Sequence, residues 1–439
     1  GRKKTDPNAK FTIIGLPDTQ FYTEEPQGQN SSGGGHNGIF KAQTQWIADH
    51  RTDSAIAFVV QLGDCVQNGD NPPGADDQIE WRRADTSFKK IEFPAVPLAD
   101  GIPYGICVGN HDQGTIGNPD GPSVFYNQYF GEARFTGRVY YGGHMGTNND
   151  NHFELFSAGG IDFIHISIEY YPNGTTPSLQ AALDWADALL KAFPNRKGIV
   201  SSHNLLSTGN PASSQGPGQK FYDDLKDNPN LMLMLAGHVA GEGRRSDMFN
   251  GNTVHTLMSD YQSGYTNGGN GYLRIMQFIP AQNLLSVKTY SPYSGTSFTG
   301  SGSQFTLPVN LTTAFELIGT SVNVASGTQT CVNWPSLEPG QTYEWYAEVI
   351  DESNNTTTGP VWTFSVPPPA PPSVTTQPQS QTVCSGEAVT FSSAASGDPV
   401  LAVYWQLSAD NGNNWTTIPG ETNSSLTFNA TAGNDGYQY

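Results

Sequence analysis

Five short polar segments, each directly following an apolar run, carry the side chains that could do chemistry in this chain. Their carboxylate, amide and imidazole groups are ligand types that divalent metals bind in proteins. In open α/β sheets the carboxyl ends of neighbouring strands meet at one crevice, so segments far apart in sequence can lie together there. We therefore predict a metal-binding crevice. The candidate side chains are Asp18, Gln20, Asp64, Asn110, His111, Asp112, His203 and His238.

The elements that must position these groups are short buried strands. Hydrophobic residues at helical spacing predict helices over residues 38–53 and 179–193. Between residue 252 and residue 290 the pattern consists of strands and turns only. This order predicts a β-sheet core with helices packed outside it. The apolar runs that end at the polar segments are residues 11–14, 57–62, 104–108, 198–200 and 231–235.

The overall composition limits what the protein binds and where it acts. The formal net charge is −19 with only 21 Lys and Arg residues, which argues against nucleic-acid binding. No run of about 18 apolar residues occurs, so we predict no membrane span. Residues 1–4 begin no signal-peptide core, and we expect a mature or trimmed product. The acidic balance and low lysine content favour a secreted or cell-surface protein of bacterial type.

Four cysteines occur in the 439 residues. Cys65 and Cys107 each follow a predicted strand that leads to the crevice, which leaves two alternatives, a disulfide or two buried thiols. Cys331 and Cys384 fall in different predicted modules, so we do not expect them to pair.

The last part of the chain has an all-β rhythm. Residues 342–349 and 361–364 resemble a fibronectin type III domain in their Tyr-x-Trp-x-Ala-x-Val and Trp-x-Phe patterns. A proline-rich stretch then predicts a semi-rigid linker. From residue 373 the chain resembles a bacterial immunoglobulin-like domain, with Cys384 and Trp405 in the expected strands. The second cysteine of that pattern would follow Tyr439, so we expect this domain to be truncated at its C-terminus.

Taken in order, the five polar segments resemble the motifs of the calcineurin-like metallophosphoesterase superfamily over roughly residues 10 to 300. The resemblance implies an α/β metallophosphoesterase fold, with two mixed β-sheets packed as a sandwich and flanked by helices, followed by two all-β sandwich domains. The expected organisation is residues 1–306 for the metallophosphoesterase domain, 307–366 for the fibronectin type III-like domain, 367–372 for the linker and 373–439 for the immunoglobulin-like domain.

The resemblance also implies roles for the polar residues. Asp64 would bridge two metals, since a carboxylate can hold two cations about 3.5–4 Å apart. Asn110, His203 and His238 would complete the ligands of the second metal. This mixture of nitrogen and oxygen ligands suits Zn, Mn or Fe, and we expect one or two such divalent transition metals.

The first metal site departs from the superfamily pattern. Asp18 and Gln20 stand in a Pro-Asp-Thr-Gln segment where Asp-x-His is usual, and Ala240 replaces the second histidine of Gly-His-x-His. Gln20 is expected to ligate the first metal together with Asp18, and Glu242 is the alternative substitute. The same variant resembles a subset of secreted bacterial members. The segment from Met258 to Gln262 also resembles members of that subset. This resemblance implies that Asp260 and Tyr261 line the cleft.

The remaining candidates would act on the substrate. His111 would donate a proton to the leaving oxygen or hold a phosphate oxygen, and Asp112 would orient its imidazole or serve as a turn residue. Arg244 and Arg245 would clamp phosphate oxygens, or else form surface ion pairs.

The sequence therefore predicts a secreted or cell-surface metal-dependent phosphoesterase that hydrolyses phosphate mono- or diesters. Attack by a metal-bound hydroxide, with His111 assisting the leaving group, is the expected mechanism. The partners would be a small phosphoester substrate and, through the β domains, the cell surface or glycans. The alternative is an extracellular structural, adhesive or assembly protein that retains a partly degenerate metallophosphoesterase domain.

Overall fold

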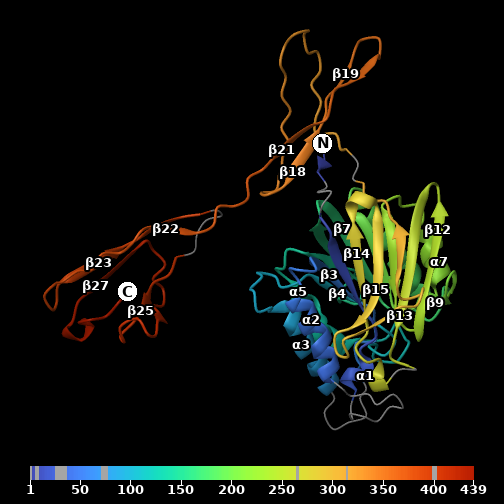
Figure 1. Ribbon diagram of the computed structural model, residues 1–439, viewed down its shortest axis with the longest axis horizontal. Helices are drawn as coiled ribbons and strands as arrows, with labels where there is room; N and C mark the ends of the chain where they lie inside the picture. Colours follow the sequence, from blue (N-terminus) through green and yellow to red (C-terminus); the bar gives the residue numbers. More distant parts are fainter. Residues whose placement is uncertain are drawn as a thin grey trace. The chain divides into compact units, whose positions relative to one another are not determined.

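The chain forms two compact units. The computed structural model describes residues 2–4, 9–24, 37–70, 78–263, 266–312, 315–397 and 403–439. The first unit is Arg2–Phe315 and the second is Glu316–Tyr439 (Figure 1). All candidate metal ligands belong to the first unit, and each unit is described by itself.

The larger sheet of the first unit has nine strands among the described residues. They are β5 (Tyr141–His144), β6 (His152–Ala158), β7 (Ile161–Ile168), β8 (Lys197–Ser202), β9 (Leu206–Gly209), β10 (Ala212–Ser214), β11 (Leu231–Ala236), β12 (Gly241–Phe249) and β13 (Asn252–Asp260). Their order is β10-β9-β12-β13-β11-β8-β7-β6-β5. Strands β13, β11, β8 and β7 are parallel, whereas β12 and β6 run antiparallel to their neighbours β13 and β7.

The smaller sheet has seven strands in the described part of the chain. They are β2 (Phe11–Leu16), β3 (Ile56–Gln61), β4 (Tyr104–Ile106), β14 (Leu273–Ile279), β15 (Leu284–Ser291), β16 (Thr296–Phe298) and β17 (Phe305–Pro308). The order is β16-β15-β14-β2-β3-β4, and β17 also pairs with β15. Strands β2, β3 and β4 are parallel, and β14 is antiparallel to β2. Both sheets are therefore mixed, as the sequence predicts.

Successive side chains of each strand enter different cores, because they point to opposite faces of the sheet. Phe58 of β3 stacks on Phe156 of β6, with ring centroids 4.3 Å apart, in the core between the two sheets. The neighbouring Val59 instead enters the core beneath the helices. Strands buried on both faces read as continuous apolar runs, which explains why these strands are visible in the sequence.

Helices cover the outer face of each sheet. The first group is α1 (Gln20–Thr23), α2 (Asn37–Asp49), α3 (Ile79–Glu92), α4 (Val124–Phe130) and α5 (Glu132–Phe135), and the second is α6 (Pro177–Ala192) and α7 (Gly218–Leu225). Residues of α2 and α3 pack on the smaller sheet and residues of α6 and α7 on the larger one, so the first unit is a layered sandwich (Figure 1). Helices α2 and α6 confirm the two predicted helices. In the described residues no helix is both long and apolar enough to span a membrane.

The first unit extends past residue 306, where the sequence places the end of the first domain. Strand β17 pairs with β15 through Pro308, and Val309 and Leu311 are buried in the core between the sheets. The unit therefore ends at Phe315. Short elements complete it, namely β1 (Arg2–Lys3), η1 (Thr266–Gly268) and η2 (Pro280–Gln282).

The two cysteines of the first unit are free and buried. Cys107 Sγ lies 3.2 Å from the carbonyl oxygen of Ile168, and burial raises the pKa of the Cys107 thiol to about 12. The thiol alternative is therefore correct and the disulfide alternative is wrong.

The second unit consists of short antiparallel strand pairs and a 3-10 turn. Pairs form between β18 (Thr342–Trp345) and β21 (Trp362–Ser365), β19 (Glu348–Ile350) and β20 (Thr356–Thr358), β22 (Ser373–Thr376) and β24 (Ala394–Ser396), β23 (Ala388–Ser392) and β27 (Ser425–Asn429), and β25 (Gln406–Leu407) and β26 (Thr416–Thr417), followed by η3 (Ala432–Asn434). Trp405 is buried, as expected for a core tryptophan. The division into two all-β domains joined by a linker stays a prediction.

Candidate metal centre

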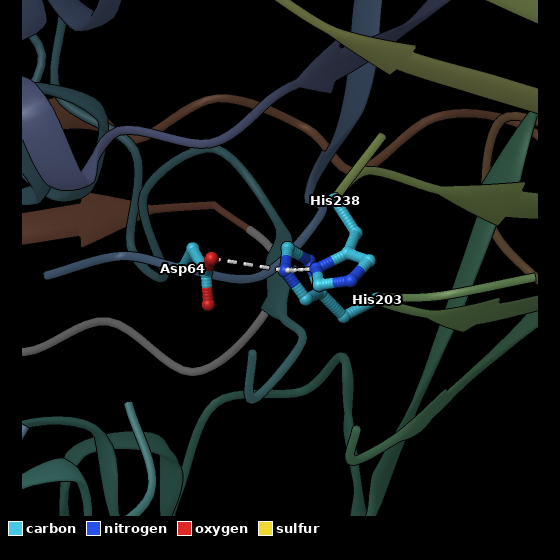
Figure 2. A group of neighbouring side chains, drawn as sticks. All are labelled: Asp64, His203 and His238. Carbon is cyan, nitrogen blue, oxygen red and sulfur yellow. Dashed lines mark hydrogen bonds and ion pairs between the residues drawn. The ribbon is translucent and has the colours of Figure 1, made fainter. Parts of the chain in front are cut away.

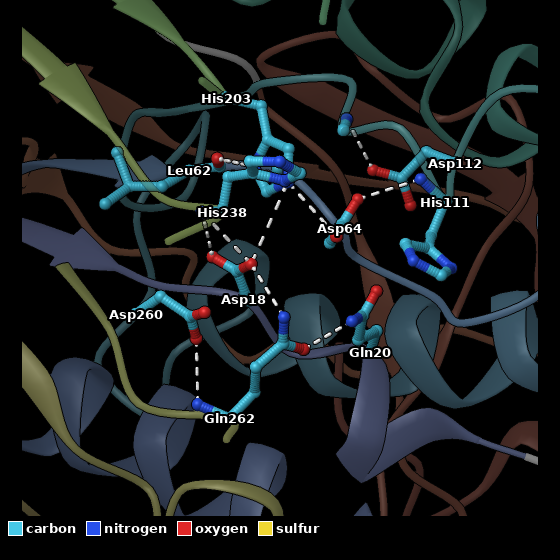
Figure 3. A network of polar contacts seen from close by, with 12 residues as sticks. Asp18, Gln20, Leu62, Asp64, His111, Asp112, His203, His238, Asp260 and Gln262 are labelled. Carbon is cyan, nitrogen blue, oxygen red and sulfur yellow. Dashed lines mark hydrogen bonds and ion pairs between the residues drawn. The ribbon is translucent and has the colours of Figure 1, made fainter. Parts of the chain in front are cut away.

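The candidate ligands follow the carboxyl ends of five strands that belong to both sheets. Asp18 comes after β2, Asp64 after β3 and Asn110 after β4. His203 follows β8 and His238 follows β11. Figure 3 shows that Asp18, Asp64, His203 and His238 lie together, which brings groups from the two sheets to one point. The predicted convergence of the strand ends is therefore present.

Three side chains form the centre of this group (Figure 2). One ligand atom each from Asp64, His203 and His238 lie within 4.8 Å of one another. His203 Nε2 lies 3.1 Å from Asp64 Oδ2 and 3.3 Å from His238 Nδ1. Carboxylate oxygen and imidazole nitrogen at this spacing are the usual ligands of zinc and similar metals.

Asn110 lies between Gly109 and His111, both of which closely approach Asp64. The residue is only 9% exposed, yet its Oδ1 accepts no hydrogen bond from the described residues. A buried acceptor without a partner costs about 1–3 kcal/mol, so such an atom requires an explanation. A cation held by this loop and the three side chains described above would supply it, so the residues present fit a divalent metal.

Glycines make room for these ligands. A Cβ atom at Gly109, the residue before Asn110, would lie 2.1 Å from the backbone nitrogen of Asp64. At Gly237, the residue before His238, it would lie 2.3 Å from Asp18 Oδ1. The Gly-Asn and Gly-His pairs in the sequence are thus required by the close approach of the neighbouring ligand. The backbone of Asp64 itself has φ of 49°, a conformation rare for residues with a side chain.

The electrostatics place a single positive charge among the ligands. Burial lowers the pKa of His203, but the carboxylates of Asp64 and Asp18 outweigh this effect and raise it to about 10. Burial and the nearby His203 lower the pKa of His238 to about 4. The surrounding carboxylates thus favour a positive charge beside Asp64 Oδ2, at the point where a metal cation would interact with the same groups.

His111 lies beside the centre. Its backbone N–H donates to Asp64 Oδ1 at 2.9 Å, and its ring Nδ1 lies 2.8 Å from the carbonyl oxygen of Gln67. Since a carbonyl only accepts, Nδ1 carries a hydrogen in this contact. The other ring nitrogen, Nε2, is then the atom that can exchange a proton with a substrate.

Asp112 does not orient the His111 ring, which corrects one of its two predicted roles. Its carboxylate accepts hydrogen bonds from the backbone N–H groups of Cys65, Val66 and Gly109 at 2.8–3.1 Å. It therefore ties the loop after β3 to the loop after β4, which is the structural alternative. The orienting contact comes from Gln67, which the sequence analysis did not single out.

The predicted first-site residues are held by a glutamine that has no assigned role in the sequence analysis. The backbone N–H of His238 lies 3.2 and 3.3 Å from the two Asp18 carboxylate oxygens. Gln262 Nε2 donates to Asp18 Oδ2 at 3.3 Å, and Gln262 Oε1 accepts from Gln20 Nε2. The signal that could have found Gln262 is its place just after a buried strand, β13.

Asp260 ends β13 and lies next to Asp18 (Figure 3). Burial and the charge of Asp260 raise the pKa of Asp18 above its usual value. Burial is also the main reason why the pKa of Asp260 is raised to about 6. Two buried carboxylates thus repel each other at the predicted first site.

Glu242 is not free to replace a missing histidine. Its carboxylate accepts hydrogen bonds from the hydroxyls of Tyr261, Thr289 and Ser303 and pairs with Arg274. The Tyr261 hydroxyl is thereby directed to Glu242. The alternative of Glu242 as a ligand is not supported, and Gln20 remains the candidate.

The two predicted phosphate-binding arginines contact other groups. The Arg244 guanidinium lies 3.9 Å from the ring centroid of Phe305, with the side-chain oxygen of Asn210 2.9 Å from Nη2. Arg245 forms an ion pair with Asp247 at 2.5 Å. Both guanidinium groups thus contact other residues of the described chain. The ion-pair alternative holds for Arg245, and neither arginine is supported as a phosphate clamp.

Tyr170 is a further residue at the centre that the sequence analysis missed. Its ring centroid lies 5.4 Å from that of His238 and 6.0 Å from that of His203. The aromatic ring therefore covers one side of the two imidazoles. No motif marks this tyrosine, because it follows β7 in a run that reads as ordinary strand.

Comparison with known families decides the assignment. The family model for calcineurin-like phosphoesterases matches residues 11–242. The chain belongs to this family. The matched range contains every candidate ligand from Asp18 to His238, including the group Asp64, His203 and His238, so the calcineurin-like phosphoesterase domain of this chain is a metal-binding domain of the phosphoester hydrolase type.

Curated relatives are only partly covered by this chain. It is 32% identical over 384 residues to the uncharacterized protein YvnB of Bacillus subtilis, which covers 81% of this chain and 27% of that protein. It is 35% identical over 108 residues to endoglucanase C of Cellulomonas fimi, over 25% of this chain and 8% of that enzyme. The chain thus spans about a quarter or less of these relatives.

Solved structures give distant likenesses. A dimetal phosphatase from Danio rerio has 15% identity and a TM-score of 0.44, with 70% of this chain and 100% of that chain covered. A 5'-nucleotidase from Candida albicans has 12% identity and a TM-score of 0.35, with 67% and 53% covered. At these low scores the likenesses add nothing to the assignment by family.

Proposed function

We propose that this chain is a secreted or cell-surface phosphoesterase that hydrolyses small phosphate mono- or diesters with the help of bound divalent metals. The observation that carries the proposal is the ligand group at the strand ends, where Asp64, His203 and His238 converge. Asn110 lies between two residues that approach Asp64, and its buried Oδ1 lacks a hydrogen-bond partner among the described residues.

The residues have separate roles in this proposal. Asn110, His203 and His238 would hold one metal, Asp18 and Gln20 the other, and Asp64 both. When bound, such metals act as Lewis acids on phosphoryl oxygens and make a nucleophile available at neutral pH. Among the side chains of the protein, His111 would take part in proton transfer. Its Nδ1 donates to the carbonyl oxygen of Gln67.

His111 would protonate the leaving oxygen. Because Nδ1–H remains bonded to the Gln67 carbonyl, Nε2 is the only ring atom that gains and loses a proton during turnover. The imidazolium form donates from Nε2 to the departing alkoxide, and the fixed ring orientation keeps this nitrogen in place. General acid catalysis of this kind contributes about 10²–10⁴-fold to the rate.

Turnover of p-nitrophenyl phosphate and bis-p-nitrophenyl phosphate by the metal-loaded protein tests the proposal. We expect Asp64→Asn to abolish activity and to lower the metal content, because this carboxylate serves both metals. His111→Ala should lower kcat about 10²–10⁴-fold with the metal content unchanged. His50→Ala is the control, since the His50 ring contacts the carbonyl and the indole ring of Trp46 in helix α2.

The alternative function is a separate outcome of the same experiment. If the metal-loaded protein hydrolyses neither ester above background, and Asp64→Asn and His111→Ala change nothing, the enzyme proposal is refuted. An extracellular structural or adhesive protein would then be favoured. The extracellular location draws its support from the acidic composition and from the stretch shared with an endoglucanase. Contacts of the second unit with glycans or the cell surface stay a prediction.

A further inference from the structure

The end of β13 supplies polar groups where the sequence leaves the first metal short of ligands. Asp260 is the Cα partner of Gly241 across the β12–β13 ladder. Gly241 directly follows Ala240, the position at which the Gly-His-x-His pattern has its second imidazole. The register therefore brings the backbone of Asp260 next to the segment that lacks the second imidazole.

Gln262 ties this segment to the predicted ligands. Its side chain contacts both Asp18 Oδ2 and Gln20 Nε2, and its backbone N–H donates to Asp260 Oδ1 at 2.8 Å. Three oxygen-bearing side chains from two distant parts of the sequence are thus oriented by one residue. Figure 3 shows Gln262 between Asp260 and Gln20, with Asp18 above it.

Each of two side chains held in this way keeps one oxygen without a partner. Asp260 Oδ2 and Gln20 Oε1 are buried and accept no hydrogen bond from the described residues, although Asp260 is 0% and Gln20 2% exposed. Buried unpaired carboxylates are costly unless a cation compensates them. The carboxylates of Asp18 and Asp260 therefore supply the negative charge of a cation site. The two oxygens without partners are available to coordinate the cation.

We infer that Asp260 is a ligand of the first metal and that Gln262 is the positioning residue of that site. With Asp18, Gln20, Asp64 and Asp260, this site offers oxygen alone, and it prefers Mn²⁺ or Mg²⁺. The second site, with His203 and His238, prefers Zn²⁺, because imidazole suits zinc whereas carboxylate and carbonyl oxygens suit magnesium and manganese. The inference rests on the proposed function for the presence of two metals.

Sequential metal binding to the metal-free full chain tests the inference. One equivalent of Zn²⁺ is added first, and Mn²⁺ is then titrated while electron paramagnetic resonance measures the free ion. We expect the wild type to bind one Zn²⁺ and one Mn²⁺. Asp260→Asn, which keeps the shape and removes the charge, should raise the Kd for Mn²⁺ at least about 100-fold and leave the Zn²⁺ equivalent in place.

Two further variants complete the design. Gln262→Ala should weaken Mn²⁺ binding about 10–100-fold, the usual effect of removing a residue that orients ligands. Asp150→Asn is the matched control, because Asp150 is a buried aspartate whose carboxylate is held by Ser123 and Asn127. It should leave both metals unchanged. Retention of the Zn²⁺ equivalent shows that each variant is folded at the metal centre.

The outcomes separate this inference from the proposed function. Wild-type affinity for Mn²⁺ in Asp260→Asn, or Zn²⁺ filling both sites with equal affinity, overturns the inference even if the protein hydrolyses phosphoesters. Conversely, a protein that binds one Zn²⁺ and one Mn²⁺ as described but turns over no phosphoester refutes the proposed function and supports the inference.

Discussion

Replacing Gly109 by alanine tests whether the geometry of the ligand loops matters for function. The added Cβ would lie 2.1 Å from the backbone nitrogen of Asp64 and 2.2 Å from its Oδ1. Asp64 cannot yield locally, because its carbonyl oxygen accepts a hydrogen bond from the Thr19 backbone at 3.0 Å. The clash therefore requires a displacement on the order of 1 Å of the residue that would serve both metals, and a misplacement of this size costs about 10²-fold in rate.

The same clash has a limited effect on folding. Overpacking of this kind costs about 1–3 kcal/mol, which a domain of ordinary stability tolerates. We therefore expect Gly109→Ala to stay folded, with kcat/KM for bis-p-nitrophenyl phosphate reduced about 10²-fold or more and with less than the full metal content. Steady-state kinetics, elemental analysis and urea unfolding measure the three effects.

Gly300→Ala is the matched control, since a Cβ at Gly300 would meet nothing within 4 Å. It should behave as the wild type in all three measurements. If Gly109→Ala binds two metals and turns over substrate at the wild-type rate, the close approach of Gly109 to Asp64 has no functional role, and the reasoning is refuted.

Three other predictions concern pH, ion pairing and metal removal. Burial and the nearby Asp150 raise the pKa of Glu169 to about 8, so its carboxyl is protonated in the folded state over a range in which the unfolded chain has lost the proton. The free energy of unfolding should therefore fall by up to about 1.4 kcal/mol per pH unit between the ordinary pKa of 4.5 and pH 8. In urea unfolding of the metal-free protein, Glu169→Gln should remove this part of the dependence of stability on pH. An unchanged dependence would contradict the reasoning. Arg134→Met should lower the free energy of unfolding by about 3 kcal/mol, because it removes a buried partner of Glu92 at 2.9 Å, and a change below 1 kcal/mol in urea unfolding would argue against it. Chelation of the metals should lower the Tm, and Zn²⁺ at about 1,000 times its Kd should restore about 4 kcal/mol, whereas a chelator-insensitive Tm would speak against a bound metal.

Glu169→Gln introduces an amide next to the side chain of Gln113. Gln113 Nε2 now donates to Glu169 Oε2 at 3.2 Å, and Gln113 Oε1 lacks a partner among the described residues. Rotation of the Gln113 amide would offer that oxygen to the new N–H group, but it would also remove the bond from Gln113 Nε2 to the carbonyl oxygen of Tyr170. The variant therefore removes the titrating carboxyl at the cost of one buried hydrogen bond.

The sequence predicts the strand ends well because of how the sandwich is buried. Strands such as β3 and β11 are covered on both faces, so they read as unbroken apolar runs, and the polar residues after them stand out. The glycines of the Gly-Asn and Gly-His pairs are equally visible. These features locate Asp64, Asn110 and His238 without any knowledge of contacts.

Side-chain partners across long sequence distances could not be predicted in this way. Arg244 follows the predicted ligand His238 closely in sequence, but its partners Asn210 and Phe305 come from other strands and loops. Asp112 is adjacent to His111, and yet its carboxylate bonds to the backbone of Cys65 and Val66, whereas the His111 ring bonds to the carbonyl of Gln67. Adjacency in sequence does not determine which partner a side chain reaches.

The end of β13 illustrates a third kind of limit. The apolar pattern stops at Met258, whereas the strand continues to Asp260 because its partner β12 pairs with it over the full length. This extension carries Asp260 and Gln262 into the centre. The resemblance leads us to expect Asp260 at the cleft, whereas the contacts of Gln262 with Asp18 and Gln20 are visible only in the folded chain.

Metal-dependent anomalous scattering from crystals soaked with Zn²⁺ and Mn²⁺ tests the central claim most directly. We predict two peaks on either side of the Asp64 carboxylate, with the zinc peak at Asn110, His203 and His238 and the manganese peak at Asp18, Gln20 and Asp260. The absence of any ordered metal at Asp64, or metal bound only at other residues, would contradict the account.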